Sequence, residues 1–415
     1  MGSFWHSFAD MAALEAGGEL VVDRGEGVYI WDEDGRRYLD ATAGLWYCNV
    51  GYGRGEIAEA AAAQLRKLSA YSTFGDLSNR PAIELAERVA AVSPDPDSKV
   101  FLTSGGSDSI DTAAKMARRY WQLLGRADRT LFVTRENAYH GMHIAGTSLA
   151  GIEANAAGYG ALVGDVAKVA WDSADALRDV IDTATPERVA AFFCEPIIGA
   201  GGVFPPPPGY LAQVREICRQ SGVLFVADEV ITGFGRAGDW FASNRWDLQP
   251  DIITCAKGIT SGYLPMGGVI ASPRVAEPFW TAGGLWRHGY TYSGHATVAA
   301  VAMANLDIME REGLPKRALQ LETDLADALS PLAEHPMVDE VRAGVGVLAA
   351  VQLSAEAIAE DLTLPRRAVA ACRDAGIMTR TLATGGLQVS PALVIDGAGL
   401  KELRDGFRAA LDALV

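Results

Sequence analysis

Short apolar runs alternate with segments of helical periodicity between Lys99 and about Ile270, and this alternation restricts the possible folds more than any other feature. Most of the runs are apolar on both faces, as expected of strands that helices cover on both sides. The expected strands are Val100–Thr103, Thr130–Thr134, Val166–Trp171, Ala190–Cys194, Val223–Ala227 and Ile252–Cys255. Helical spacing lies between them, for example in Ile110–Trp121 and Leu211–Cys218. The pattern predicts an α/β fold with a mostly parallel sheet.

The two flanks of this region have a different pattern. Val28–Trp31, a turn at Asp32–Gly35 and Arg37–Asp40 together predict an antiparallel hairpin. An Ala-rich helix is expected from about Ser293 to Met309. Beyond it, the expected elements are strands at Leu348–Leu353 and Leu387–Val389 and a helix at about Arg366–Ala375 that Gly376 closes. These elements predict a smaller α+β domain.

The length of the chain favours a division into two domains, because 415 residues are enough to bury more than one core. We expect residues 51–300 to form a large domain and residues 301–415 to form a small one. The N-terminal segment, residues 1–50, is expected to pack with the small domain.

Charge and cysteine content exclude several classes of function. A net charge of −16 repels nucleic-acid backbones and anionic membranes, so neither is an expected partner. The five cysteines are scattered and form no CxxC pair, which disfavours a disulfide framework and a zinc site. The first residues lack a basic start followed by an apolar run, and no stretch of 18 uncharged apolar residues occurs. We therefore expect a soluble protein of the reducing cytoplasm, with no metal site.

The first of four chemical motifs is the Gly-Ser segment Thr103–Ser109, between an expected strand and an expected helix. Its glycines allow a close backbone approach to an anion, Ser107 can donate its hydroxyl, and the helix N-terminus is positively polarised. The segment predicts a phosphate-binding loop. A Gly-rich turn in which a Ser or Asp caps the helix explains the same residues.

The second motif is Asn137–Gly141, which follows another expected strand and contains Tyr139 and His140. A loop tyrosine next to a glycine can lie flat on a planar ring, as a heteroaromatic cofactor requires. Taken alone, a tyrosine of the core or of the surface explains this motif as well.

The third motif is Val226–Val230, where an apolar strand ends in Asp228 and Glu229. Ligands of open α/β sheets bind beyond the carboxyl ends of the strands. A carboxylate at that place needs a cation or a strong donor, and a protonated pyridine nitrogen is such a partner. An Asp that caps the next turn or pairs with an arginine is the alternative.

The fourth motif is Thr254–Gly258, in which Lys257 follows an apolar strand. A lysine in an apolar setting is expected to have a lowered pKa and a nucleophilic amine, suited to forming a Schiff base. A lysine at the sheet edge whose amine reaches solvent is the alternative.

The four motifs, in this order, resemble the class III (omega-amino-acid) aminotransferases of the type I fold of transferases that depend on pyridoxal 5'-phosphate (PLP). The resemblance covers essentially the whole chain. It implies PLP as the cofactor, a Schiff base at Lys257, and a pyridine nitrogen held by Asp228. It also implies that Tyr139 stacks on the ring and that Gly106 and Ser107 bind the phosphate.

The same resemblance assigns further cofactor contacts. Val230 is implied on the opposite ring face, and His140 and Glu195 are implied beside the cofactor. Thr291 matches a threonine that reaches the phosphate across a dimer interface, which implies a homodimer with shared active sites. The segment Gly235–Gly238 departs from the family pattern, which leaves the role of its arginine, Arg236, open.

Four residues are implied in substrate binding. Trp46 and Phe74 resemble the aromatic pocket of the amine:pyruvate branch, to which Tyr139 also contributes. Arg380 resembles a mobile arginine that pairs with a carboxylate through two parallel hydrogen bonds and swings aside for an apolar group. A solvent-facing Arg380, or Arg236 as the carboxylate clamp, are the alternatives.

The function implied is omega-transamination, in which an amine or omega-amino acid gives its amino group to a keto acid, with pyruvate the expected acceptor. Lys257, once freed, acts as the base. A PLP-dependent aminomutase or a dialkylglycine-type decarboxylase on the same scaffold is the alternative, recognised by isomerisation without keto-acid consumption or by release of carbon dioxide. A non-enzymatic binding protein is disfavoured by the intact set of Asp228, Lys257 and Ser107.

Overall fold

The computed structural model describes residues 3–415, and its largest sheet has seven strands in the order β4-β10-β9-β8-β7-β5-β6. The strands are β4 (Lys99–Thr103), β5 (Leu131–Arg135), β6 (Val166–Val169), β7 (Val189–Cys194), β8 (Leu224–Asp228), β9 (Ile252–Cys255) and β10 (Gly267–Ala271). Strand β10 is antiparallel to both of its neighbours, and the other pairs are parallel. The predicted mostly parallel sheet is therefore confirmed.

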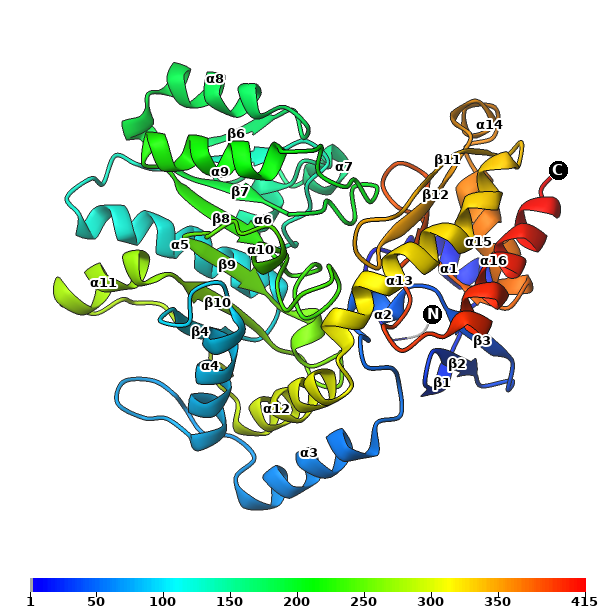
Figure 1. Cartoon of the computed structure of the whole chain (residues 1–415), viewed down its shortest axis with the longest axis horizontal. Helices are drawn as coiled ribbons and strands as arrows, with labels where there is room; N and C mark the ends of the chain where they lie inside the picture. Colours follow the sequence, from blue (N-terminus) through cyan, green and yellow to red (C-terminus); the bar gives the residue numbers. More distant parts are fainter. Residues whose placement is uncertain (1–2) are drawn as a thin grey trace.

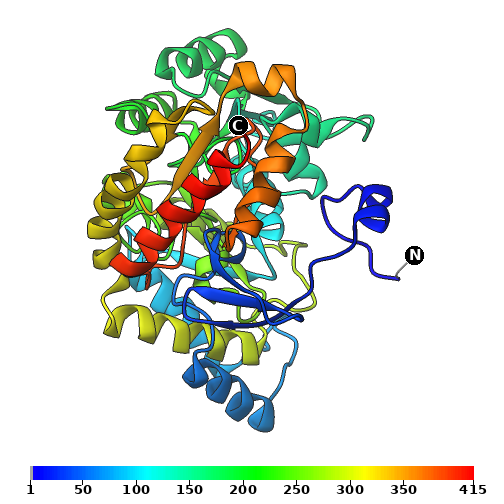
Figure 2. The same ribbon diagram turned by 90° about the vertical axis from the view of Figure 1, so that its right-hand side faces the viewer.

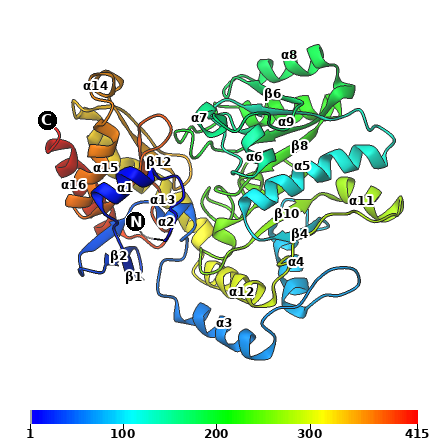
Figure 3. The ribbon, with the colours of Figure 1, turned by 180° about the vertical axis from the view of Figure 1, so that it is seen from behind.

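Helices cover both faces of this sheet, which explains why its strands are apolar on both sides. In β7, Phe192 packs in the cluster that includes α8 and α9, whereas its neighbour Phe193 packs against α5. Figure 1 shows the α9 face and Figure 3 the α5 face. The helices of this part are α4 (Arg80–Val92), α5 (Gly106–Leu123), α6 (Ile144–Leu149), α7 (Glu153–Ala156), α8 (Ala174–Ala184), α9 (Tyr210–Ser221), α10 (Ala242–Arg245) and α11 (Pro273–Thr281).

A second part of the molecule carries two smaller sheets, on the right in Figure 1. One sheet has the order β1-β2-β3-β13 and the other β11-β12-β14. Their strands are β1 (Val22–Glu26), β2 (Tyr29–Asp32), β3 (Arg37–Asp40), β11 (Val338–Arg342), β12 (Ala349–Leu353), β13 (Ile377–Met378) and β14 (Leu387–Val389). The expected hairpin is present as the antiparallel pair β2–β3.

Strand pairing joins the two ends of the chain. Strand β13 lies parallel to β3, with Ile377 opposite Leu39. The helices around these sheets are α2 (Ala43–Trp46), α13 (Leu314–Leu329), α14 (Ala355–Glu360), α15 (Leu364–Asp374) and α16 (Gly397–Asp412). We propose that residues 22–50 and 301–415 form the small domain, whereas the expected division gave it the whole N-terminal segment. The boundary falls within α12 (Ala296–Arg311), which packs on α3 (Gly55–Lys67) and α4.

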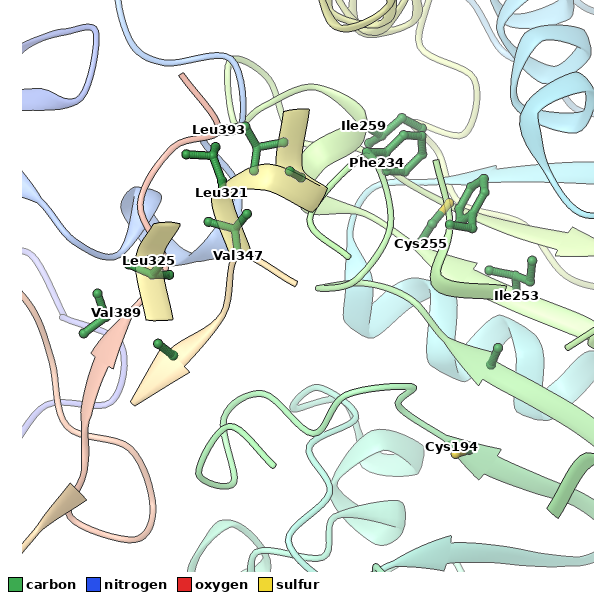
Figure 4. Close-up of a cluster of buried hydrophobic side chains, with 14 of the residues drawn as sticks. Cys194, Phe234, Ile253, Cys255, Ile259, Leu321, Leu325, Val347, Val389 and Leu393 are labelled. Carbon is green, nitrogen blue, oxygen red and sulfur yellow. The ribbon is translucent and has the colours of Figure 1, made fainter. Parts of the chain in front are cut away.

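One apolar core runs from the large sheet into the small domain. Figure 4 shows Ile253 and Cys255 of β9 in the same cluster as Leu321 of α13 and Val389 of β14. This continuity fixes the small-domain strands relative to the carboxyl ends of the large sheet. No helix of the described part is long and apolar enough to cross a lipid bilayer.

The N-terminal helix α1 (Met11–Gly17) makes little contact with this core. None of its residues is buried, and Figure 2 shows it standing away from the rest of the chain. Phe4, Trp5 and Phe8, which precede it, are all exposed.

Candidate active site

A cavity of about 410 Å³ opens beyond the carboxyl ends of the central strands. Because parallel strands all point the same way, the residues that follow them meet at one edge of the sheet. The predicted residues that line the cavity are Gly106, Ser107, Tyr139, His140, Glu195, Asp228, Val230 and Lys257. The four motifs therefore converge on one site.

Asp228 is the last residue of β8, and its carboxylate is held by three donors. One oxygen accepts a hydrogen bond from His140 Nδ1 at 2.7 Å. The other accepts from Thr254 Oγ1 at 3.0 Å and from the backbone N–H of Val230 at 3.2 Å. The side chain is almost fully buried at the cavity wall. A fixed carboxylate in this position is suited to a cationic partner in the cavity.

Lys257 follows β9 after one intervening residue, and its backbone has a φ of 45°. Burial lowers the pKa of its amine to about 8, although the carboxylates of Asp228 and Glu195 oppose the shift. A lysine with this pKa has a substantial neutral fraction near pH 8 and is a nucleophile there. Lys257 is therefore suited to attack an aldehyde.

An anion cradle lies where α5 begins at Gly106. A Cβ added at Gly106 would lie 3.0 Å from Val230 Cγ1, and one at Gly141 would lie 2.5 Å from Ser107 Oγ. Gly141 also has a φ of +84°, which favours glycine. The Ser107 hydroxyl accepts the backbone N–H of Met142 at 3.1 Å and lines the cavity. The open helix N-terminus and this hydroxyl together suit a phosphate.

Glu195, after β7, holds the loop that carries Tyr139. Its two carboxylate oxygens accept the backbone N–H groups of Tyr139 at 2.9 Å and of Gly199 at 3.0 Å. Burial raises the pKa of Glu195, while the nearby His140 opposes that shift. The carboxylate lines the cavity and positions the tyrosine at the same time.

Arg380 and Trp46 come from the small domain and lie together near Lys257. The Arg380 guanidinium stacks over the Trp46 ring at 4.3 Å, and Lys257 Nζ is 6.0 Å from the same ring. Arg380 Nε donates to Gln388 Oε1 at 2.7 Å. Burial lowers the pKa of Arg380 to about 10. Arg380 is thus partly buried and packs on Trp46, which disfavours the alternative of a fully solvent-facing side chain.

The loop that presents Trp46 is conformationally strained and is held by Asp40. Ala43, Gly44 and Trp46 all have positive φ values, of 46°, 69° and 64°. The buried Asp40 carboxylate accepts the backbone N–H groups of Thr42 and Gly44 at 2.8 and 2.6 Å. These bonds stabilise the loop that places the tryptophan in the site.

Arg236 has a structural role. The side chain is fully buried and donates to Asn49 Oδ1 and to the carbonyl oxygen of Pro391, each at 2.6 Å. It thus connects the segment after β8 with Asn49 near the start of the chain and with Pro391 near its end. The alternative of Arg236 as the carboxylate clamp is wrong, because its guanidinium is used by these internal acceptors.

Four predicted residues lie outside the cavity lining: Trp46 and Arg380, which pack on each other near Lys257, and Phe74 and Thr291. Phe74 and Thr291 are both exposed in the described chain. They are close neighbours in space, because Phe74 packs on Gly289 and the Thr73 hydroxyl donates to the Ser293 carbonyl at 2.9 Å. Neither residue belongs to the cavity lining that contains Lys257.

Sequence reasoning missed several residues that shape the site. Thr254, Asp40 and Gln388 act only through hydrogen bonds to other residues. The one local signal for Thr254 was that it is a polar residue inside an apolar strand. Gln388 and Asp40 had no comparable local pattern, because their partners lie far away in the sequence.

Comparison with known proteins agrees with the geometry. The family model "Aminotransferase class-III" matches residues 12–411. The putrescine–pyruvate aminotransferase of Pseudomonas aeruginosa is 39% identical, over 98% of this chain and 93% of that protein. The diaminobutyrate–2-oxoglutarate transaminase of Halomonas elongata is 36% identical, over 91% of this chain and 86% of that protein.

Solved structures of similar proteins share the whole fold. An (S)-enantioselective omega-transaminase from Thermomicrobium roseum has a TM-score of 0.95 at 39% identity, covering 99% of this chain and 96% of its own. A PLP-bound amine transaminase from an uncultivated Pseudomonas species has a TM-score of 0.95 at 35% identity, covering 100% and 99%.

The residues around the cavity fit PLP. The anion cradle suits its phosphate, the fixed Asp228 carboxylate suits its protonated ring nitrogen, and the Lys257 amine suits its aldehyde. These three features line a single cavity. The chain belongs to the class III aminotransferases and is a PLP-dependent transaminase.

Proposed function

We propose that this aminotransferase is an omega-transaminase that takes the amino group from an amine or omega-amino acid and gives it to pyruvate. The observation that carries the proposal is the stacking of Arg380 on Trp46, which puts a cation and an aromatic wall side by side. The cation suits the carboxylate of a keto acid, and the wall suits an uncharged substituent. The similarity to a putrescine–pyruvate aminotransferase supports the same substrate classes.

In the proposed mechanism each residue has one task. When bound, PLP supplies an aldehyde for the substrate amine and a ring that accepts electrons. Asp228 would hold the ring nitrogen, and Tyr139 would lie against the ring. Ser107 and the N-terminus of α5 bind the phosphate. Lys257, neutral above a pKa of about 8, would remove the proton from the amine-bearing carbon of the substrate and deliver it to the bound cofactor, so that the amino group stays with the cofactor.

Arg380→Ala is the test of the proposed substrate class. The KM for pyruvate is expected to rise about 10- to 100-fold, because a buried carboxylate loses a charged hydrogen-bond partner. The KM for a neutral arylalkylamine is expected to change little, and this serves as the internal control. Steady-state kinetics with both substrates measures the difference. An equal loss with both substrates, or isomerisation without consumption of pyruvate, would contradict the proposal.

The lowered pKa of Lys257 predicts how covalent loading of PLP depends on pH. Loading needs the neutral amine, so the rate is expected to rise with pH and to reach half its maximum near pH 8. A model amine such as N-acetyl-lysine, with a pKa of about 10.4, is the control. Absorbance of the apoenzyme mixed with PLP measures the rate. A midpoint as high as that of the model amine would contradict the assigned environment.

We further propose a homodimer in which Phe74 and Thr291 of each subunit complete the site of the other. Both residues are exposed, lie beside each other and are outside the lining of their own cavity. The exposed aromatic side chains before α1 offer additional apolar surface to a second copy of the chain. Light scattering is expected to give twice the mass of the chain.

A mixing experiment tests the shared site. Lys257→Ala and Thr291→Asp variants, each inactive alone, are mixed under conditions that exchange subunits. Mixed dimers then contain one site with both native residues, so activity is expected to recover to roughly a quarter of the wild-type value. No recovery despite exchange would show that Thr291 acts within its own subunit.

We also propose a cytoplasmic location. The five cysteines are all buried and unpaired in the described chain, which suits a reducing compartment. Fractionation of cells that produce the protein tests this location.

A further inference from the structure

Gln388, at the centre of β14, is a fully buried amide in direct contact with Arg380. Its Oε1 accepts the Arg380 Nε hydrogen at 2.7 Å. Its Nε2 donates to Ser390 Oγ at 2.8 Å and to the Thr42 carbonyl at 3.4 Å. Because a carbonyl only accepts, the amide nitrogen must face Thr42 and the amide oxygen must face Arg380. The orientation of this side chain is therefore set by its surroundings.

The backbone reinforces the pairing of the two residues. The Gln388 N–H donates to the Arg380 carbonyl at 3.0 Å, and the Thr379 hydroxyl donates to the Gln388 carbonyl at 2.7 Å. Arg380 and Gln388 are thus neighbours in both main chain and side chain. Thr42, the other contact of the amide, precedes the strained loop that carries Trp46. Gln388 therefore contacts both Arg380 and Thr42, the residue just before the loop that carries Trp46.

These contacts leave one side of the Arg380 guanidinium free. Nε is occupied by Gln388, and one face of the group lies on Trp46. Among residues 3–415, Nη1 and Nη2 have no hydrogen-bond acceptor. Those two nitrogens are the ones that can bind both oxygens of a carboxylate in parallel. With Nε taken, this end-on arrangement is the one available to a substrate.

We propose that Gln388 is a specificity-determining residue that positions Arg380 for end-on binding of a substrate carboxylate. The inference rests on the proposed role of Arg380 in keto-acid binding. Loss of the Gln388 oxygen frees Nε, so that Arg380 samples other positions and binds a carboxylate less well. The same loss makes it easier for Arg380 to move aside for a bulky uncharged group.

Gln388→Met tests the inference, because methionine keeps the volume of the side chain but removes the strong acceptor. The expected result is a rise of about 10-fold in the KM for pyruvate and in the inhibition constant of propionate. Propionate carries the carboxylate without the keto group, so its inhibition reports binding alone. The kcat at saturating pyruvate is expected to stay within about two-fold, and the KM for a neutral arylalkylamine is expected to stay or fall.

A matched control exists on the neighbouring strand. Gln352 of β12 accepts a hydrogen bond from Arg342 Nη2 at 2.8 Å and donates to the carbonyl groups of Leu353 and Thr384, with no hydrogen bond to Arg380. Gln352→Met removes the same kind of Gln–Arg contact and is expected to leave the binding of pyruvate and propionate unchanged. If Gln388→Met does not fold, Gln388→Asn keeps a buried amide but withdraws its oxygen, and a smaller change in the same direction is expected.

A double-mutant cycle separates positioning from a general structural effect. In an Arg380→Ala background, Gln388→Met is expected to change neither the KM for pyruvate nor propionate inhibition further. A full effect of Gln388→Met without Arg380, or a fall in kcat with all substrates at unchanged KM, would overturn the inference. If Arg380→Ala alone leaves pyruvate binding intact, the proposed function fails and this inference fails with it. If Arg380→Ala weakens pyruvate binding but Gln388→Met does not, only the inference about Gln388 fails.

Discussion

Replacement of Lys257 by alanine is expected to lower the transamination rate by at least about 1,000-fold, because the variant loses both the nucleophile and the base. Burial has already brought the pKa of this amine down to about 8, so its proton transfer is tuned to near-neutral pH. Lys257 is the only lysine among the described residues that line the cavity, so no second lysine amine there can replace it as the nucleophile. Steady-state kinetics with saturating PLP measures the loss.

The control for this substitution is Lys401→Ala. Lys401 is an exposed residue of α16 and is remote in sequence from the residues of the site. It is expected to retain full activity. A Lys257→Ala variant that keeps more than about a tenth of the wild-type rate would contradict the assigned role, since general acid–base catalysis alone contributes at least about 100-fold.

Asp228→Asn is expected to lower kcat by about 100- to 1,000-fold, the range found when one charged or dipolar contact to a reacting system is removed. Asparagine keeps the size of the side chain and can still accept from Thr254 Oγ1 and the Val230 N–H. It lacks the negative charge that keeps a pyridine nitrogen protonated. The expected change is therefore in the rate of proton removal more than in cofactor retention.

Asp251→Asn is the matched control for Asp228→Asn. Asp251 is a buried carboxylate just before β9, at the opposite end from Lys257, and it binds Arg274 at 2.9 Å. Its replacement is expected to lower thermal stability while leaving kcat unchanged. Single-turnover mixing with an amine substrate follows proton removal directly. An Asp228→Asn enzyme with the wild-type single-turnover rate would contradict a charge-based role.

The central strands and their mostly parallel pairing could be predicted, because runs that are apolar on both faces need helices on both sides. The order of these strands in the sheet was not predicted. Strand β10 (Gly267–Ala271) was not among the expected strands, since its first two residues are glycines and carry no apolar pattern. Its antiparallel direction depends on pairing with the preceding strand β9 and with β4, which is distant in sequence. Long-range pairing of this kind leaves no local signal.

A cavity residue could be predicted where a chemically reactive side chain stands at the end of an expected strand. Asp228 ends one buried strand and Lys257 follows the next, so their meeting at one edge follows from parallel topology. The support of Arg380 by Gln388 was not predictable, because the amide acts through a bond between two folded segments. Phe74 and Thr291 matched the family pattern, yet their contribution depends on a second subunit and stays a proposal.

The covalent bond between the Lys257 amine and the cofactor aldehyde is the central claim, and borohydride reduction tests it most directly. The holoenzyme is reduced, digested and mapped by mass spectrometry, with the Lys257→Ala variant as the control. The account predicts that the reduced pyridoxyl group lies on the peptide that contains Lys257 and is absent from the variant. A reduced adduct on a different lysine, with Lys257 unlabelled, would contradict it.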